Sequence, residues 1–138
     1  MAVVVGTLIV VHGLITLAIG STALSGAPPP QGASSLPGAG WYPLAFGESW
    51  LFSGSAIRLG GVLWLAAGIG LLATAAAMFG FVLPTSAWRV LGVVSAVTGL
   101  AALGTFFHPY YVIGILANIA ILAGVTTMES TSRRLFGI

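Results

Sequence analysis

Residues 2–24 read AVVVGTLIVVHGLITLAIGSTAL and contain no charged side chain. An α-helix rises about 1.5 Å per residue, so a helix of this length can cross the hydrocarbon core of a bilayer, which is about 30 Å thick. The stretch lacks the basic n-region of a secretory signal peptide, and its apolar run exceeds the usual ~7 to 15 residues of such a signal. We therefore expect a retained helix that crosses a membrane.

The composition of the whole chain agrees with this interpretation. Of its 138 residues, 58% are hydrophobic and only 4% are charged. A soluble domain normally carries about a quarter charged residues, most of them on its surface. Most of the outer surface must therefore face lipid, and the chain is predicted to be an integral membrane protein.

Three further apolar runs follow the first, and the expected helices cover about residues 2–24, 57–83, 88–107 and 110–128. The connections between the last three helices, at Pro84 to Ala87 and at His108-Pro109, are very short. Such short connections force neighbouring helices to run antiparallel. We predict an all-α fold in one domain, residues 1–138, formed by a four-helix membrane bundle with up-down-up-down order.

A long outer loop, residues 25–56, separates the first two helices. It opens with three prolines, Pro28 to Pro30, which cannot continue a helix. Its second half gathers five aromatic residues, Trp41 and Trp50 among them, and aromatic rings favour the headgroup boundary of a membrane. We expect a short interfacial helix that covers the bundle; the alternative is an aromatic belt with no further role.

The arginines predict the orientation. Arg89 follows the second helix, and Arg133 and Arg134 follow the fourth, so an even number of spans places all three on one face. Positive residues mark the cytoplasmic side. We expect a multi-pass protein of the cell inner membrane with both termini in the cytoplasm, although Arg58 falls at the outer end of the second helix.

Small residues at regular spacing predict how the helices associate. The first helix carries Gly6, Gly13 and Gly20 at intervals of seven residues, and each later helix has a comparable stripe of Gly, Ala, Ser or Thr. Because lipid is as apolar as Leu, membrane helices associate through close van der Waals fit, which such faces allow. The stripes favour tight packing within the bundle, against other membrane subunits, or in self-association.

Three polar residues lie deep in the predicted membrane. His12 is about 15 Å into the first helix, Thr16 is one turn further along, and Asn118 is about 12 Å into the last helix. His12 and Asn118 can meet if the first and last helices are neighbours. His12 could then serve as a proton relay, a ligand contact or an axial haem ligand; the structural alternative is a neutral imidazole bonded to Asn118 or to a backbone carbonyl.

A second candidate ligand site lies at the predicted outer face. It comprises the charged residues Glu48 and Arg58, which could form an ion pair, together with His108, Trp41 and Trp50. The aromatic residues near the headgroups could hold a lipid, a quinone or a pigment.

Other chemistry finds little support. The chain has no cysteine, which excludes thiolate catalysis, iron–sulfur clusters and covalent haem attachment. It has two His and two acidic residues, too few for the three or four convergent ligands of a stable metal site. The basic residues do not cluster as a nucleic-acid site requires. We predict no catalytic residues, no metal, no cofactor and no nucleic-acid partner.

A resemblance adds to this interpretation. The pair His12-Gly13, Trp64, the turn Phe107-His108-Pro109 and the run GILANIAIL at 114–122 look similar to segments of small uncharacterised four-helix bacterial membrane proteins. Chain length and helix number are also similar to those of DoxX-like proteins. The resemblance implies the same four-span layout and no particular activity.

Three functional hypotheses follow. The first is a non-enzymatic small polytopic protein, an accessory or structural subunit of a larger membrane complex. The second is a small transporter or channel with a polar site at His12, Thr16 and Asn118. The third is a lipid or quinone binder at the outer face.

Overall fold

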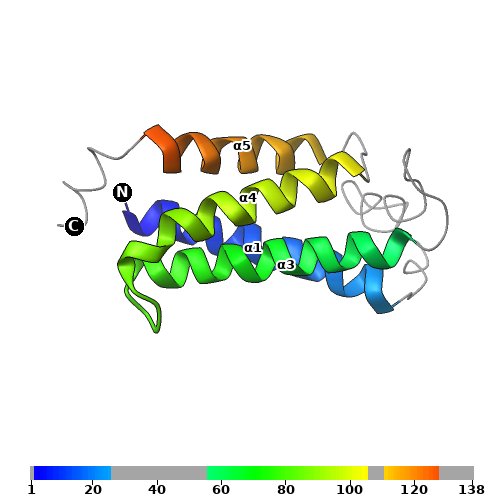
Figure 1. The fold of residues 1–138 in the computed structure, drawn as a ribbon, viewed down its shortest axis with the longest axis horizontal. Coiled ribbons are helices and arrows are strands. Elements are labelled where there is room, and N and C mark those ends of the chain that lie inside the picture. The colour runs from blue at the N-terminus through cyan, green and yellow to red at the C-terminus, as the bar shows by residue number, and fades with distance from the viewer. Residues whose placement is uncertain (1, 26–55, 106–110, 128–138) are drawn as a thin grey trace.

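The computed structural model describes residues 2–25, 56–105 and 111–127. The described residues form an all-helical protein without strands (Figure 1). Its elements are the helices α1 (Ala2–Ser25), α3 (Ala56–Met78), α4 (Trp88–Thr105) and α5 (Val112–Thr127), with a 3-10 turn, η2 (Thr85–Ala87), before α4. The predicted all-α class is confirmed, whereas the predicted interfacial helix falls at 25–56, almost wholly outside the described residues.

Three of these helices are long and apolar enough to cross a membrane. The corresponding segments are Val3–Leu24, Leu59–Met78 and Thr85–Thr105, of 22, 20 and 21 residues. The apolar part of α5, Val112–Thr126, is shorter. The 16 residues of α5 rise about 24 Å, less than the roughly 30 Å of a hydrocarbon core. The structure thus supports a membrane protein with three clear candidate spans.

The prediction that the second helix reaches residue 83 is wrong, because α3 ends at Met78. The chain turns at Gly80, whose φ is +68°. The Gly80 amide donates to the carbonyl of Ala77, and the Phe81 amide donates to that of Ala76, at 3.1 and 2.8 Å. These two bonds form a Schellman motif, which satisfies the last carbonyls of a helix and usually requires glycine at its left-handed position. Apolarity alone could not reveal this stop.

Glycines bring α1 and α3 into close contact. A Cβ atom on Gly20 would lie 2.7 Å from the backbone nitrogen of Leu65, and one on Gly68 would lie 2.9 Å from that of Leu17. At the other end, Gly6 lies against the ring of Phe79. Early residues of α1 therefore meet late residues of α3, so the two helices run antiparallel. The seven-residue glycine stripe is used for packing inside the chain.

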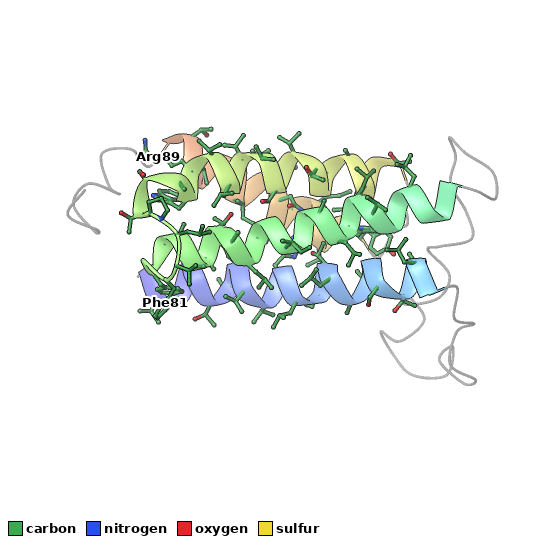
Figure 2. All side chains as sticks on the ribbon, turned by 60° about the horizontal axis from the view of Figure 1, so that its bottom comes forward. Phe81 and Arg89 are labelled. Atoms are coloured by element: carbon green, nitrogen blue, oxygen red, sulfur yellow. The ribbon has the colours of Figure 1, made fainter. Side chains whose placement is uncertain are left out.

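Each later helix packs on the one before it. Gly70 of α3 lies against Ser95 of α4, and a Cβ atom on Gly92 of α4 would lie 3.1 Å from Cγ2 of Val125 on α5. In Figure 1, α5 lies beside α4, and α3 runs in front of α1; in Figure 2, α4, α3 and α1 follow one another from top to bottom, with α5 behind α4. The contact between α1 and α5 is much less extensive than the contacts of α1 with α3, of α3 with α4 and of α4 with α5.

Two apolar clusters form the core. One is near the start of α4 and includes Leu71, Met78, Trp88 and Val125. The other, near the start of α5, contains Ile19, Trp64, Ala102, Leu103 and Tyr111. Outside these clusters large apolar side chains are exposed along all four helices, for example Val3, Ile69, Val90 and Ile113, each at least 60% exposed. A surface of this kind matches lipid rather than water.

Candidate functional site

The structure joins the two polar residues that sequence placed deepest. Nε2 of His12, in the middle of α1, lies 3.2 Å from Nδ2 of Asn118 on α5. The contact that their similar depths allowed, if the first and last helices were neighbours, is therefore present. It is a side-chain hydrogen bond between two helices that are otherwise in little direct contact.

A second bond sets the orientation of the Asn118 amide. Nδ2 also lies 2.8 Å from the carbonyl oxygen of Gly114, one turn earlier on α5. A carbonyl oxygen only accepts, so the atom facing it must be the amide nitrogen and not the amide oxygen. The nitrogen therefore donates to His12 as well, and Nε2 must accept. His12 is accordingly a neutral imidazole that carries its proton on Nδ1.

The same orientation leaves the amide oxygen without a partner. Asn118 is only 2% exposed, and its Oδ1 accepts no hydrogen bond from any described residue. The oxygen lies beside Gly99 of α4, where a Cβ atom would come within 2.8 Å of it. A buried carbonyl oxygen without a donor costs about 1 to 3 kcal/mol. Asn118 thus offers one acceptor that the described part of the chain does not use.

Thr16 faces the same region but its hydroxyl is engaged. Its Oγ1 donates to the carbonyl oxygen of His12, 2.7 Å away on the preceding turn of α1. This i to i−4 bond is the usual way in which a helix satisfies a threonine in an apolar environment. Thr16 therefore lines the site, and the hydrogen of its hydroxyl is already donated.

These residues border a cavity of about 360 Å³ between α1 and α5. Leu71 and Leu103 contribute to its apolar wall from α3 and α4. Ile15 and Ile113, which are 45% and 79% exposed, border it from α1 and α5 on the side that faces outward. Cavities of about 300 to 1,000 Å³ with mostly apolar walls and a few polar groups are typical of small-molecule sites.

Two aromatic residues that were not predicted beside His12, Thr16 and Asn118 also line this cavity. Trp64 of α3 and Tyr111, which directly precedes α5, line it, and their ring centroids are 5.6 Å apart at an interplanar angle of 58°. Trp64 is 1% exposed and Tyr111 is 4% exposed. Trp64 lies more than two turns into α3 and Tyr111 lies at the start of α5, and nothing in the sequence indicates that they meet.

The predicted outer-face site cannot be compared with the structure. Glu48, His108, Trp41 and Trp50 lie outside the described residues, as does the side chain of Arg58 on the first turn of α3. The predicted ion pair and the predicted aromatic ligand site therefore stay predictions. In the part of the chain that the structure describes, no three His, Cys, Asp or Glu side chains lie together.

The fold and the site define a helical protein with three helices suited to span a membrane and a polar pair beside an apolar cavity. Comparison of the chain with protein-family models, with curated proteins and with solved structures gave no match. The resemblance to small four-helix bacterial membrane proteins accordingly stays a prediction.

Proposed function

We propose that this protein is a non-enzymatic, multi-pass membrane protein that binds a small lipid-soluble molecule in the cavity between α1 and α5. The cavity carries the proposal. Its walls are mostly apolar, no lining residue is charged, and one polar pair lies at its edge. A lipid-soluble molecule could enter sideways past Ile15 and Ile113 without leaving the membrane.

The test of this function fills the cavity from one helix. A Cβ atom on Gly114 would lie 3.4 Å from Cδ1 of Leu103 and 4.0 Å from Cε1 of His12, so a larger side chain at this position extends toward the cavity. Gly114→Leu should abolish retention of co-purified small molecules, measured by native mass spectrometry in a mild detergent. Gly124→Leu is the matched control, because a Cβ atom there has no neighbour within 4 Å. Equal retention in both variants would refute a cavity site.

The membrane arrangement is part of the same proposal. We place α5 as a fourth, shorter span, in up-down-up-down order, with both termini in the cytoplasm of a cell with an inner membrane. Gly6 of α1 lies against Phe79, and Phe81 and Arg89 lie at that same end of the bundle (Figure 2). The positive charge of Arg89 supports a cytoplasmic location for this end.

The absence of native cysteine makes the orientation simple to test. Ser86→Cys, in the turn before α4, should be blocked from a membrane-impermeant maleimide in intact cells and labelled after the membrane is opened. Labelling of Ser86→Cys in intact cells would show that the orientation is the opposite of the proposed one.

An accessory subunit of a larger complex is a second candidate. The exposed apolar surface of α5, with Ile113 79% and Leu116 60% exposed, supports contact with lipid or with another membrane protein. The glycine stripe that motivated this hypothesis is occupied by α3, which weakens it. Native-size analysis in mild detergent separates the two candidates, since an accessory subunit should migrate with a partner or with copies of itself. Transport of the bound molecule, the second of the three sequence-based hypotheses, would use the same cavity.

A further inference from the structure

We propose that the cavity between α1 and α5 holds one acyl tail of a bilayer phospholipid, whose headgroup stays at the membrane surface. The inference rests on the proposed binding function and names the chemical class of its ligand. Three features of the cavity carry it: the engagement of its polar groups by the protein, its direction along the bundle, and the exposed residues on its lipid-facing side.

The polar groups around the cavity are engaged by the protein itself. Nε2 of His12 accepts from the Asn118 amide, whose other hydrogen is directed to the Gly114 carbonyl. The Thr16 hydroxyl donates to the carbonyl of His12. Oδ1 of Asn118 and the hydroxyl oxygen of Tyr111 are buried, so a molecule in the cavity does not reach them. A ligand therefore meets mainly apolar surface, which suits hydrocarbon and makes burial of a polar or ionised group costly.

The cavity extends along the bundle from its middle toward one end. His12 borders it near the middle of α1, and Ile19 borders it seven residues later, which is about 10 Å further along the helix. Leu103, near the end of α4, and Tyr111, directly before α5, also line it. The end of α4 and the start of α5 lie at the same end of the bundle (Figure 1). This length fits within the hydrocarbon of one leaflet, about 15 Å or half of a bilayer core, where acyl tails run in the same direction as the helices.

The side of the cavity that faces the lipid provides the entrance. Ile15 of α1 and Ile113 of α5 border the cavity, and they are 45% and 79% exposed. The helices that carry them are in little direct contact, so a chain can pass between them without separating a tightly packed interface. A phospholipid needs such an opening, because its tail enters the protein while its headgroup stays outside.

The experiment uses Trp64 as the reporter. It lines the cavity and is only 1% exposed, so lipid reaches its ring only by entering the cavity. The full chain with Trp41→Phe, Trp50→Phe and Trp88→Phe retains Trp64 alone. It is reconstituted in phosphatidylcholine vesicles with plain or with brominated acyl tails, and bromine quenches tryptophan fluorescence on contact. A second sample in plain vesicles is titrated with bromohexane, a short apolar molecule without a headgroup.

Brominated tails should reduce the emission of Trp64 nearly as much as that of a lipid-exposed reporter. The matched reporter is Val97→Trp on α4, where the native side chain is 52% exposed, combined with Trp64→Phe. Gly114→Leu should remove most of the quenching of Trp64, since its side chain extends toward the cavity, whereas Gly124→Leu should leave it unchanged. Gly114→Ala, whose Cβ atom makes only an ordinary contact at 3.4 Å, provides a milder variant in case leucine prevents folding.

The outcomes separate the ligand class from the proposed function. Quenching of Trp64 by bromohexane but not by brominated tails would overturn the acyl tail and leave the cavity site in place. Absence of quenching by both probes would overturn the proposed function as well. Equal quenching in Gly114→Leu and Gly124→Leu would show that lipid reaches Trp64 by another path, which also contradicts the proposal. The comparison of the two probes on the Trp64 reporter chain does not depend on whether the Gly114 variants fold.

Discussion

Gly99 on α4 provides the space that the Asn118 side chain on α5 occupies. A Cβ atom on Gly99 would lie 2.8 Å from Oδ1 and 3.1 Å from Nδ2, closer than side chains normally approach one another. This close approach of α4 aligns the amide with the Gly114 carbonyl and with His12 on α1. One missing methyl group on α4 thus determines how α5 connects to α1.

Gly99→Ala should therefore destabilise the protein. The added methyl group must displace the amide, which forces a repacking cost of about 1 to 3 kcal/mol and weakens the bond to His12. The free energy of unfolding can be measured by titrating the folded protein in mild detergent with sodium dodecyl sulfate. Gly104→Ala, on the same helix, is the control because its Cβ atom meets nothing within 4 Å. If both variants unfold at the same point, the amide does not need the space at Gly99.

Gly20→Ala should cost more than Gly13→Ala. A Cβ atom on Gly20 would meet backbone atoms of α3, the Leu65 nitrogen at 2.7 Å and the Gly61 oxygen at 2.9 Å, and backbone cannot move aside. At Gly13 the nearest atom is a side-chain carbon of Leu71 at 3.2 Å. Helix propensity alone would favour alanine by about 1 kcal/mol at both positions.

The same unfolding titration measures this pair. We expect Gly20→Ala to unfold at a clearly lower concentration of dodecyl sulfate than the parent protein. Gly13→Ala should unfold at a concentration between those of Gly20→Ala and the parent. Gly124→Ala, in open space, should be neutral or slightly stabilising. Equal effects at Gly20 and Gly13 would show that α1 and α3 are not in backbone contact near Gly20.

His12→Leu should destabilise the bundle by about 1 kcal/mol, because Nδ2 of Asn118 loses its acceptor on α1, and polar bonds between membrane helices average about 0.6 kcal/mol and reach about 1.7. His12→Gln should cost less, since the glutamine oxygen can accept from the same amide. Val11→Leu is the control on the same turn of α1, where the side chain is 48% exposed. A glutamine variant as unstable as the leucine variant would contradict the acceptor role assigned to Nε2.

Val82→Gly should raise the stability of the protein. Val82 has a φ of +62° and a fully exposed side chain. Its left-handed backbone conformation therefore costs free energy that no packing of the side chain offsets. Such a conformation costs a residue with a Cβ atom about 1 to 2 kcal/mol, part of which glycine loses again through its greater freedom when unfolded. We expect a net gain of about 0.5 to 1 kcal/mol in the free energy of unfolding. Val82→Ala keeps the Cβ atom and should give no comparable gain; equal gains would rule out backbone strain as the cause.

Much of the helical layout could be predicted from the sequence, because it depends on local chemistry. The length of a charge-free apolar run shows whether it can cross a bilayer. The predicted first helix, 2–24, matches α1 to within one residue. The depth of His12 and of Asn118 follows from the rise of a helix, and their similar depth allowed a contact on the condition that the first and last helices are neighbours, which the structure provides. The end of α3 was mispredicted because residues 79–83 are almost all apolar, and the decisive signal was the single glycine at position 80.

The sequence by itself determined that this chain is helical and apolar enough for a membrane, since backbone groups in hydrocarbon must satisfy one another within helices. Only the tertiary structure decided that the glycines of α1 face α3, that Gly99 makes room for Asn118, and that Trp64 and Tyr111 meet in the wall of a cavity. The physical reason is that amino-acid composition and hydrophobic periodicity determine the structure of one segment at a time. Contacts such as these depend on which helix faces are brought together, and a glycine that could meet any neighbour does not specify which one.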